Sequence, residues 1–533
     1  MERMVDGSGE RLSFSSRRLP PSFLRRTVRI AAGGTRPFAR AEWAGALVVV
    51  ERGEVELECE DGSRRRFRCG DVLWLEDLPL VALHNRGRRS TLLVAISRRI
   101  GSLGIRSSAM RLAPVESLQG CEGDHPRRPP STRKEPAVSS PTSVSIVREL
   151  DASLRGPVIG PDDADYDRTR TVFVGGIDRR PAAIARVADA GDVANAITFA
   201  RETGLELAVR SGGHSSAGHG VTEGGLVIDL RELTDLELDP EGRTAWVQTG
   251  LTAGGYTAAA DAHGLATGFG DTGSVGIGGL TLGGGIGFLV RKHGLTIDQL
   301  LEAELVTADG ELLRVDGDHH PELFWAIRGG GGNFGVATRF RFRLHEVGLV
   351  AGGLLILPAT PEVITSFLAE ADAAPEELST IANVMPAPPM PFVPEEQHGR
   401  LVVLALMVFA GDPEAGERAL APFRSLAPPI ADLLRPMRYP EIFFPDEEDY
   451  HPMAEARTMF VDAVDATAVE TIVDRLESSD APMRVTQLRV LGGAMARVPN
   501  DATAFAHRDR RLMVTVAALY ERPEEAPDRK SVV

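Results

Sequence analysis

Cysteine is scarce in this 533-residue chain, which has only Cys59, Cys69 and Cys121. Their number is odd, and no two of them have the close C-x-x-C spacing of a zinc ligand pair or a redox motif. A disulfide framework would need several cysteines that can pair. The sequence therefore supports neither a disulfide-stabilised fold nor a zinc site.

Long apolar runs are also absent. The longest run, Leu401–Ala410, is too short to cross a bilayer, because a membrane-spanning helix needs about 20 predominantly apolar residues. Met1–Gly34 contains no apolar stretch of the length found in a signal peptide. We therefore expect a soluble, cytoplasmic protein.

Positive charge is in short supply as well. The chain has 59 Lys and Arg residues against 75 Asp and Glu residues, which gives a formal net charge of -16 at pH 7. Because nucleic acids and anionic membranes are bound by clustered Lys and Arg, we expect neither as a partner. A nucleotide-binding P-loop is excluded too, since no GxxxxGK[ST] motif occurs.

The length and the hydrophobic content predict several domains. A chain of 533 residues exceeds one ordinary domain and should divide into two to four. A hydrophobic content of 43% is enough to form their cores.

The first hundred residues predict a small β-barrel. From about Thr27 to Arg99, short apolar segments are separated by turn pairs such as Asp61-Gly62. The part GDVLWLEDLPLVALHN resembles a cupin, a family that often has a metal-binding histidine near the position of His84. The preceding motif, RAEWAGALVVVERGE, contains no histidine, and a metal needs several converging ligands. We therefore expect residues 1–100 to form a metal-free barrel with a structural or sensory role.

Residues 101–145 predict a flexible linker. The segment is rich in Ser, Pro and charged residues, as in GCEGDHPRRPPSTRKEPAVSSPTS. Such a composition cannot bury enough apolar surface to fold. We expect this linker to tether the barrel to the rest of the chain.

Glycine dominates the stretch from Arg210 to Phe288, which opens with RSGGHSSAGHG and closes with TGSVGIGGLTLGGGIGF. A backbone without Cβ atoms can approach a large anionic ligand closely and direct successive N–H groups at its phosphates. The stretch therefore predicts a ligand cradle made of backbone, with His214 as its one chemical handle. Arg210 has a second interpretation as a cap on the strand end, and His219 is expected to be solvated or locally hydrogen-bonded.

The pattern before His214 is typical of a β-α-β unit. It consists of a strand over Ala183–Ala188, a helix capped by Asp189 or Asp192, and a strand over Leu205–Val209. His214 therefore follows a strand end, where a rigid scaffold presents a loop to a ligand.

These motifs resemble the PCMH-type FAD-binding domain of the covalent FAD-linked oxidase family, which includes berberine bridge enzyme and 6-hydroxy-D-nicotine oxidase. The resemblance covers roughly Leu150 to Val347, with a weaker continuation to about Tyr520. It implies that His214 carries the flavin covalently and that the glycine track covers the pyrophosphate and the isoalloxazine. The implied cofactor-binding residues are Arg210, Ser211, Gly212, Gly213, His214, Ser215, Gly218, Thr272, Gly273, Ser274, Val275, Gly276, Gly278, Gly279, Gly283, Gly284, Gly285 and Gly287.

The chain departs from this family at two places. Berberine-type members form a second covalent link through a cysteine of the glycine track, where this chain has Thr272, so we expect a single bond. Family members also carry a C-terminal Tyr-x-Asn-Tyr or Tyr-x-Asn-Phe pattern near the flavin. This sequence stops before any such pattern, so we expect its substrate domain to be truncated at the C-terminus.

The expected fold class is α+β. After the barrel, the resemblance implies a two-subdomain FAD-binding domain over residues 146–348 and an α+β substrate-binding domain over residues 349–533. We expect helices there over Pro361–Ala373, Pro413–Leu426 and Ala468–Leu476.

The resemblance also implies the chemistry. A substrate C–H that bears an alcohol or amine gives a hydride to FAD, and molecular oxygen reoxidises the flavin to give hydrogen peroxide. A small-molecule substrate and oxygen are thus the expected partners. The catalytic base stays open among Tyr439, Glu441, Tyr450 and His507. The alternative is a non-enzymatic regulator, in which the barrel senses a ligand and the rest is a flavin-free scaffold.

Two segments, Gly268–Gly273 and Gly330–Gly335, fit the letters of GxGxxG. The dinucleotide-binding fingerprint must follow a strand and open a helix, whereas each of these segments follows a helix-like segment. We interpret both as chance matches in a glycine-rich sequence.

Overall fold

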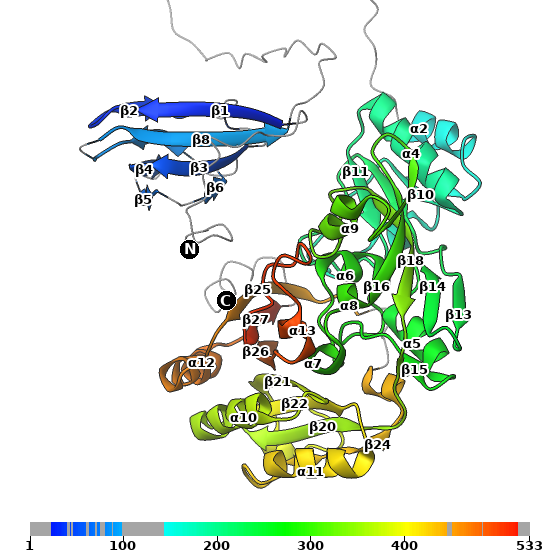
Figure 1. Ribbon diagram of the computed structural model, residues 1–533, viewed down its shortest axis with the longest axis vertical. Helices are drawn as coiled ribbons and strands as arrows, with labels where there is room; N and C mark the ends of the chain where they lie inside the picture. The colour runs from blue at the N-terminus through cyan, green and yellow to red at the C-terminus, as the bar shows by residue number, and fades with distance from the viewer. Residues whose placement is uncertain are drawn as a thin grey trace, which may run out of the picture. The chain divides into compact units, whose positions relative to one another are not determined.

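The computed structural model describes residues 23–39, 43, 46–59, 63–69, 72–74, 80–87, 89–98, 143–444, 450–481 and 483–520. The chain divides into two compact units, residues 1–133 and 134–533, and each is described by itself (Figure 1). Most of the predicted linker lies outside the described residues, and helix α2 (Ser143–Asp151) begins within its last three residues.

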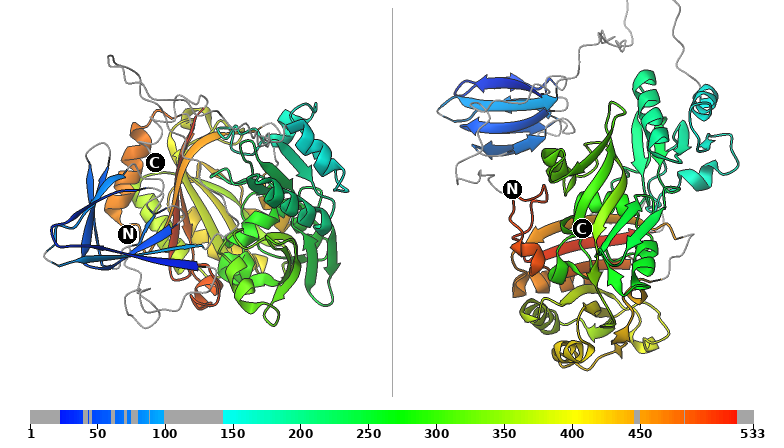
Figure 2. Two further views of the ribbon diagram at one scale, coloured as in Figure 1. Left: turned by 90° about the horizontal axis from the view of Figure 1, so that it is seen from above. Right: turned by 45° about the vertical axis from the view of Figure 1, so that its right-hand side comes forward.

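The first unit contains two antiparallel four-stranded sheets that face each other (Figure 2). The strand orders, β1-β8-β3-β6 and β2-β7-β4-β5, are those of an eight-stranded jelly roll. Both sheets contribute to one core, with Val48 and Leu93 from the first and Leu57, Phe67 and Leu83 from the second. The predicted strands are confirmed, whereas the cupin resemblance stays a prediction. The strands are β1 (Phe23–Ile30), β2 (Thr35–Pro37), β3 (Ala46–Arg52), β4 (Glu54–Cys59), β5 (Arg64–Arg68), β6 (Val72–Trp74), β7 (Leu80–His84) and β8 (Thr91–Arg98).

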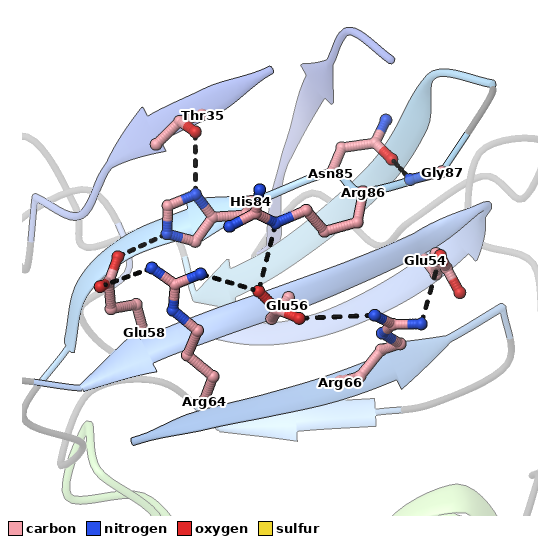
Figure 3. A network of polar contacts seen from close by, with 10 residues as sticks. All are labelled: Thr35, Glu54, Glu56, Glu58, Arg64, Arg66, His84, Asn85, Arg86 and Gly87. Carbon is pink, nitrogen blue, oxygen red and sulfur yellow. Dashed lines mark hydrogen bonds and ion pairs between the residues drawn. The ribbon is translucent and has the colours of Figure 1, made fainter. Parts of the chain in front are cut away.

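His84 belongs to a polar network on one sheet of this unit (Figure 3). Its Nε2 lies 2.6 Å from Glu58 Oε2, and its Nδ1 lies 2.8 Å from Thr35 Oγ1. Hydrogen bonds from Arg64 and then His84 hold the pKa of Glu58 below its usual value. Leu57, the neighbour of Glu58 in β4, points into the core, so the network lies on the sheet's outer face. Within the described ranges, no group of three His, Cys, Asp or Glu side chains could hold a metal ion.

The second unit begins with a four-stranded sheet of order β11-β12-β10-β9. β10 (Ala183–Arg186), β11 (Leu207–Arg210) and β12 (Leu226–Asp229) are parallel, and β9 (Val158–Ile159) is antiparallel. Helix α4 (Ala190–Thr203) connects β10 to β11, which confirms the predicted β-α-β unit. The carboxylate of Asp189 caps this helix by accepting from the Asp192 backbone N–H at 3.0 Å.

A five-stranded antiparallel sheet of order β13-β14-β18-β16-β17 follows. Helices α5 (Ala253–Asp261), α6 (Ile277–Gly283) and α9 (Pro321–Ile327) contribute to its core, in which Phe340 and Phe342 of β18 are buried. The short helices α7 (Val290–His293) and α8 (Thr296–Gln299) and the pair β15 (Leu265–Ala266) and β19 (His345–Glu346) complete this part. The strands of the sheet are β13 (Leu236–Asp239), β14 (Thr244–Gln248), β16 (Leu300–Val306), β17 (Leu312–Asp316) and β18 (Val336–Arg343).

The last part of the chain forms an eight-stranded sheet of order β23-β20-β22-β21-β26-β27-β25, with β24 paired to β20. Helices α10 (Pro361–Ala373), α11 (Pro413–Arg424) and α12 (Ala466–Ser478) pack against one face (Figure 1, Figure 2). These helices confirm the three predicted ones. The remaining elements are β20 (Val350–Pro358), β21 (Leu378–Pro386), β22 (Leu401–Phe409), β23 (Ala431–Asp432), β24 (Arg435–Met437), β25 (Met453–Val461), β26 (Met483–Val490), β27 (Leu512–Tyr520) and α13 (Ala494–Arg497).

The opposite face of this sheet packs on the glycine-rich part of the chain. Phe288, the last residue of the glycine-rich stretch, and Leu289 share a buried cluster with Ile381 of β21 and Val408 of β22. This contact places the sheet beside the glycine track. No helix in the described part of the chain is both long and apolar enough to cross a membrane.

Candidate functional site

A cavity of about 570 Å³ lies where three glycine-rich segments meet. They are the turn after β11, the start of α6, and the loop between α9 and β18. The structure thereby brings together eleven of the predicted site residues. Those that line the cavity are Arg210, Ser211, Gly212, Gly213, His214, Ser215, Val275, Gly276, Gly278, Gly279 and Gly283.

The wall of this cavity depends on a direct contact between two glycine backbones. A Cβ atom on Gly212 would lie 2.2 Å from the backbone N of Gly276, and a Cβ on Gly276 would lie 2.0 Å from Ser211 Oγ. No real Cβ tolerates such distances, so both positions need glycine. Ser211 Oγ also donates to the Thr249 carbonyl oxygen at 2.6 Å. The turn and the start of α6 are therefore held together by backbone.

Other glycines of the wall face open space. A Cβ on Gly279, Gly283 or Gly332 would meet no protein atom within 4 Å, and all three residues line the cavity. Side chains at these positions would fill space that glycine leaves free. The wall therefore fits a large ligand that the backbone approaches closely, as the sequence predicts.

His214 lies in the cavity wall, and its ring stacks on Phe173. The ring centroids are 4.3 Å apart and the interplanar angle is 19°. The Phe173 backbone N–H donates to the Gly213 carbonyl oxygen at 3.2 Å, which fixes Phe173 to the same turn. The Tyr450 ring lies edge-on to Phe173, with ring centroids 6.3 Å apart. The imidazole is thus held in one plane at the cavity surface.

A buried ion pair lies at the base of the turn. Arg210 and Asp229 are register partners at the ends of the parallel strands β11 and β12. Arg210 Nη2 donates to Asp229 Oδ2 at 2.7 Å, and the two side chains are 1% and 0% exposed. Burial alone would raise the pKa of Asp229, but Arg210 and Arg231 outweigh it and hold this pKa below its usual value. The pair fixes the point from which the turn leaves the sheet.

Seven predicted site residues lie outside the cavity wall: Gly218, Thr272, Gly273, Ser274, Gly284, Gly285 and Gly287. Some of these are packing positions. A Cβ on Gly287 would lie 1.5 Å from the Phe269 carbonyl oxygen, and one on Gly285 would lie 2.1 Å from Thr296 Oγ1. Gly273 instead faces Phe443, whose Cβ would be 3.5 Å from an added Cβ.

The segment that contains Thr272 borders the eight-stranded sheet. Thr272 Oγ1 donates to Asp271 Oδ1 at 3.3 Å, and Asp271 forms an ion pair with Arg489 of β26. Arg489 Nε donates to Gln487 Oε1 at 2.8 Å, and Gln487 Nε2 donates to Asn383 Oδ1 of β21 at 2.9 Å. A row of polar groups therefore runs from the glycine track across two strands of the sheet.

The loop between α9 and β18 contributes wall residues that the sequence analysis missed. Gly331, Gly332 and Gly335 line the cavity, and the Gly331 N–H donates to the Leu282 carbonyl oxygen of α6 at 3.0 Å. This loop follows a helix and precedes a strand, so it is not a dinucleotide-binding fingerprint. The interpretation of Gly330–Gly335 as a chance match to that fingerprint is therefore confirmed, but the sequence analysis did not predict that these glycines help to form the cavity.

His219 also lines the cavity. It is exposed, and its backbone N–H donates to Ser215 Oγ at 3.4 Å. The expectation of a solvated, locally hydrogen-bonded residue is met, but the wall position was not foreseen.

Two of the four candidates for the catalytic base, Tyr439 and Glu441, lie outside the cavity lining. Tyr439 is fully buried, and burial raises the pKa of its hydroxyl. Glu441 accepts from Arg435 at 2.7 Å and from the Arg438 backbone N–H at 2.8 Å. Arg435 and that N–H lower the pKa of Glu441.

The other two candidates are exposed. His507 stacks on Phe460 with ring centroids 4.4 Å apart, and Tyr450 is 44% exposed. Tyr450 is not in the cavity lining, and its ring contacts Phe173, which stacks on His214. The assignment of a catalytic base therefore stays open.

Residues 181–316 of this chain match the protein family described as "FAD binding domain". The (R)-6-hydroxynicotine oxidase of Paenarthrobacter nicotinovorans is 36% identical over 292 residues, which cover 54% of this chain and 62% of that protein. The match therefore spans less than two thirds of that relative. An uncharacterized FAD-linked oxidoreductase of Bacillus subtilis is 32% identical over 67% of this chain and 80% of its own length.

A solved structure agrees with these sequence matches. The crystal structure of 6-hydroxy-D-nicotine oxidase from Arthrobacter nicotinovorans superposes with a TM-score of 0.61 at 29% identity. The superposition covers 71% of this chain and 86% of that structure.

Proposed function

Because this chain belongs to the FAD-linked oxidoreductases, we propose that it is an oxidase whose FAD lies in the glycine-lined cavity. One observation carries the proposal: the RSGGHS turn, the start of α6 and the glycine loop before β18 line a single cavity. The regulator alternative is not favoured, because the relatives are an oxidase and an FAD-linked oxidoreductase.

The residues present fit such a cofactor. The exposed backbone at Gly279, Gly283 and Gly332 leaves room for a large ligand, and unshielded N–H groups suit its phosphates. The eleven lining members of the predicted set would hold the cofactor. Gly285 and Gly287 would support the track by close packing.

We assign covalent attachment of the flavin to His214. Attachment needs a neutral imidazole nitrogen held beside a docked cofactor. Stacking on Phe173 restricts the ring to one plane, and the ring lies in the wall of the proposed FAD site. Thr272 is not expected to carry a bond, because a hydroxyl is a poor nucleophile unless a base activates it, and the neighbouring Asp271 carboxylate is already paired with Arg489.

The proposed reaction is oxidation of a C–H group that bears an alcohol or an amine. Bound FAD supplies the hydride acceptor and the route to molecular oxygen, which gives hydrogen peroxide. The chain's own groups would bind the substrate between the glycine track and the eight-stranded sheet. The row from Asp271 through Arg489 to Gln487 offers charged and amide groups there. We propose residues 146–348 as the FAD-binding domain and residues 349–533 as the substrate-binding domain.

Acid precipitation tests the assignment. The purified protein should be yellow, should keep its flavin after acid precipitation, and should form hydrogen peroxide with an alcohol or amine substrate. His214→Ala should lose the acid-stable flavin but retain some dissociable FAD. His219→Ala is the matched control, because this neighbouring histidine also lines the cavity.

Peptide mass mapping locates the bond. Flavin mass on the peptide that contains Thr272, or flavin that stays attached in His214→Ala, would contradict the assignment to His214. A colourless protein that neither binds FAD nor consumes oxygen would instead contradict the enzyme proposal.

A further inference from the structure

A second cavity in the same unit has no part in the proposed FAD site. Its volume is about 560 Å³, and its wall comes from the turn between β13 and β14, the end of α7, and the segment from β18 to β19. We propose that this cavity binds a small oxyanion, such as a phosphate group, and takes up a proton with it. The lining residues are Gly242, Arg243, Thr244, His293, Leu301, Arg343, Leu344, His345 and Glu346.

Arg343 supplies the charge for anion binding. It is the last of three alternating arginines on β18, of which Arg339 pairs with Glu237 and Arg341 lies 3.9 Å from Glu302. Across the residues that the structure describes, the Arg343 guanidinium has no hydrogen-bond or ion-pair partner, although the Arg343 backbone carbonyl accepts from Thr267 Oγ1.

The wall also contains one carboxylate, that of Glu346. It forms an ion pair with Arg243, so its negative charge is compensated within the wall. Arg243 and Glu346 neutralise each other, and the Arg343 guanidinium has no counter-ion. The wall therefore has an excess positive charge, which suits an oxyanion.

Two histidines form the side of the cavity beside Arg343. The rings of His293 and His345 stack with centroids 3.9 Å apart and an interplanar angle of 16°. The Gln299 amide Nε2 donates to the His293 carbonyl oxygen, which turns Gln299 Oε1 toward His345 Nε2 at 2.6 Å. An amide oxygen can only accept, so His345 carries its proton on Nε2. Nδ1 is then the His345 ring nitrogen that can take up another proton.

Both imidazoles are neutral near pH 7. Burial, followed by the charges of Arg343, Lys292 and Arg243, lowers the pKa of His345 to about 4. Burial, followed by His345 and Lys292, lowers the pKa of His293 to about 3. Because stacked imidazolium rings would repel each other, we expect one proton uptake, at His345.

These charges determine whether anion binding favours or opposes protonation of His345. The groups around His345 are the cations of Arg243, Arg343 and Lys292, the ring of His293, and the carboxylate of Glu346, which Arg243 neutralises. A bound anion offsets the cations and therefore raises the pKa of His345. Anion affinity should then increase as the pH falls through the raised pKa, and level off below about 4.

Histidine-selective ¹³C labelling and NMR test this proposal on the full chain. Sulfate is the first probe, because it stays a dianion over the whole pH range, and chloride at equal ionic strength is the reference. Sulfate should raise the His345 pKa by about one unit or more, which corresponds to about tenfold tighter binding at the acid end. His345→Gln assigns the resonance.

Arg343→Gln should abolish the sulfate effect. Arg339→Gln is the matched control, because it removes an arginine from the same strand that Glu237 already neutralises, and it should leave the effect intact. If sulfate changed the His345 pKa equally in both variants, or changed the His319 pKa by the same amount, the effect would be general ionic screening. Either result would overturn the proposed site. Calorimetric titration of the wild-type protein with sulfate gives an independent readout, and no binding at acid pH would also overturn it.

Competition against sulfate identifies the source of the oxyanion. Tighter competition by phenyl phosphate than by inorganic phosphate would assign the cavity to a phosphate monoester. Equal competition would assign it to the free anion. Competition by neither would overturn the proposal.

Discussion

Replacing Gly279 by alanine separates the stability of the chain from its capacity to hold FAD. Gly279 lies within α6, and a Cβ there would meet no protein atom within 4 Å. Alanine in a helix is favoured over glycine by roughly 0.5–1 kcal/mol. Gly279→Ala should therefore leave the cofactor-free protein as stable as the wild type, or slightly more stable.

The same methyl group should weaken cofactor binding, because it enters the cavity from the wall. In a His214→Ala background, where FAD is dissociable, we expect the Kd for FAD to rise at least about tenfold, which corresponds to about 1.4 kcal/mol. Flavin fluorescence measures the Kd, and thermal unfolding without added FAD measures stability.

Gly276→Ala provides the contrast. Its Cβ would lie 2.2 Å from the Gly212 backbone N, so we expect it to destabilise the chain itself by about 1–3 kcal/mol through overpacking. If Gly279→Ala binds FAD as tightly as its parent, the cavity between α6 and the RSGGHS turn is not the cofactor site.

Three further outcomes are expected. Phe173→Leu should slow covalent attachment of added FAD, whereas Phe173→Tyr, which keeps a stacking ring, should not; equal rates in mass spectrometry would exclude a role for the stack. Deleting Met1–Ser140 should leave a flavoprotein, and loss of flavin upon this deletion would show that the first unit supports the site. Asp229→Asn should cost about 3–5 kcal/mol of unfolding free energy, because it leaves Arg210 buried without its counter-ion. Folding lowers the pKa of Asp229 below its ordinary value of 3.8. The difference in unfolding free energy between the wild type and Asp229→Asn should therefore reach its full size above pH 3.8 and shrink as the pH falls through the lower pKa of the folded protein. Denaturant unfolding at several pH values measures this difference.

The elements that the sequence predicts correctly are those with local sequence signals. The cap at Asp189, the left-handed Gly204 and the Pro361 start of α10 are each specified by a few neighbouring residues. The β-α-β unit and the helices α10, α11 and α12 could therefore be predicted. The RSGGHS turn was identified by its motif, and the structure places this turn in the wall of the cavity.

The features that the sequence did not predict depend mostly on contacts between segments that are far apart in the chain. Glycine has a low helix propensity, so the helix α6 inside the glycine track had no local signal. Gly331 joins the wall across a hydrogen bond to Leu282, which lies far earlier in the chain. The His293 and His345 rings stack although His293 ends α7 and His345 begins β19, far apart in the chain. No pattern in the sequence marks these meetings.

The contact between Gly212 and Gly276 also bears on how fast a ligand can enter. Neither glycine has a side chain that would lose conformational freedom upon binding. The contact between them is made by backbone atoms, which hold each other in place. Binding to such a preorganised wall loses little conformational entropy. Association with this part of the cavity should therefore follow one simple exponential at each ligand concentration, with a rate that rises linearly with concentration rather than reaching a plateau set by loop closure.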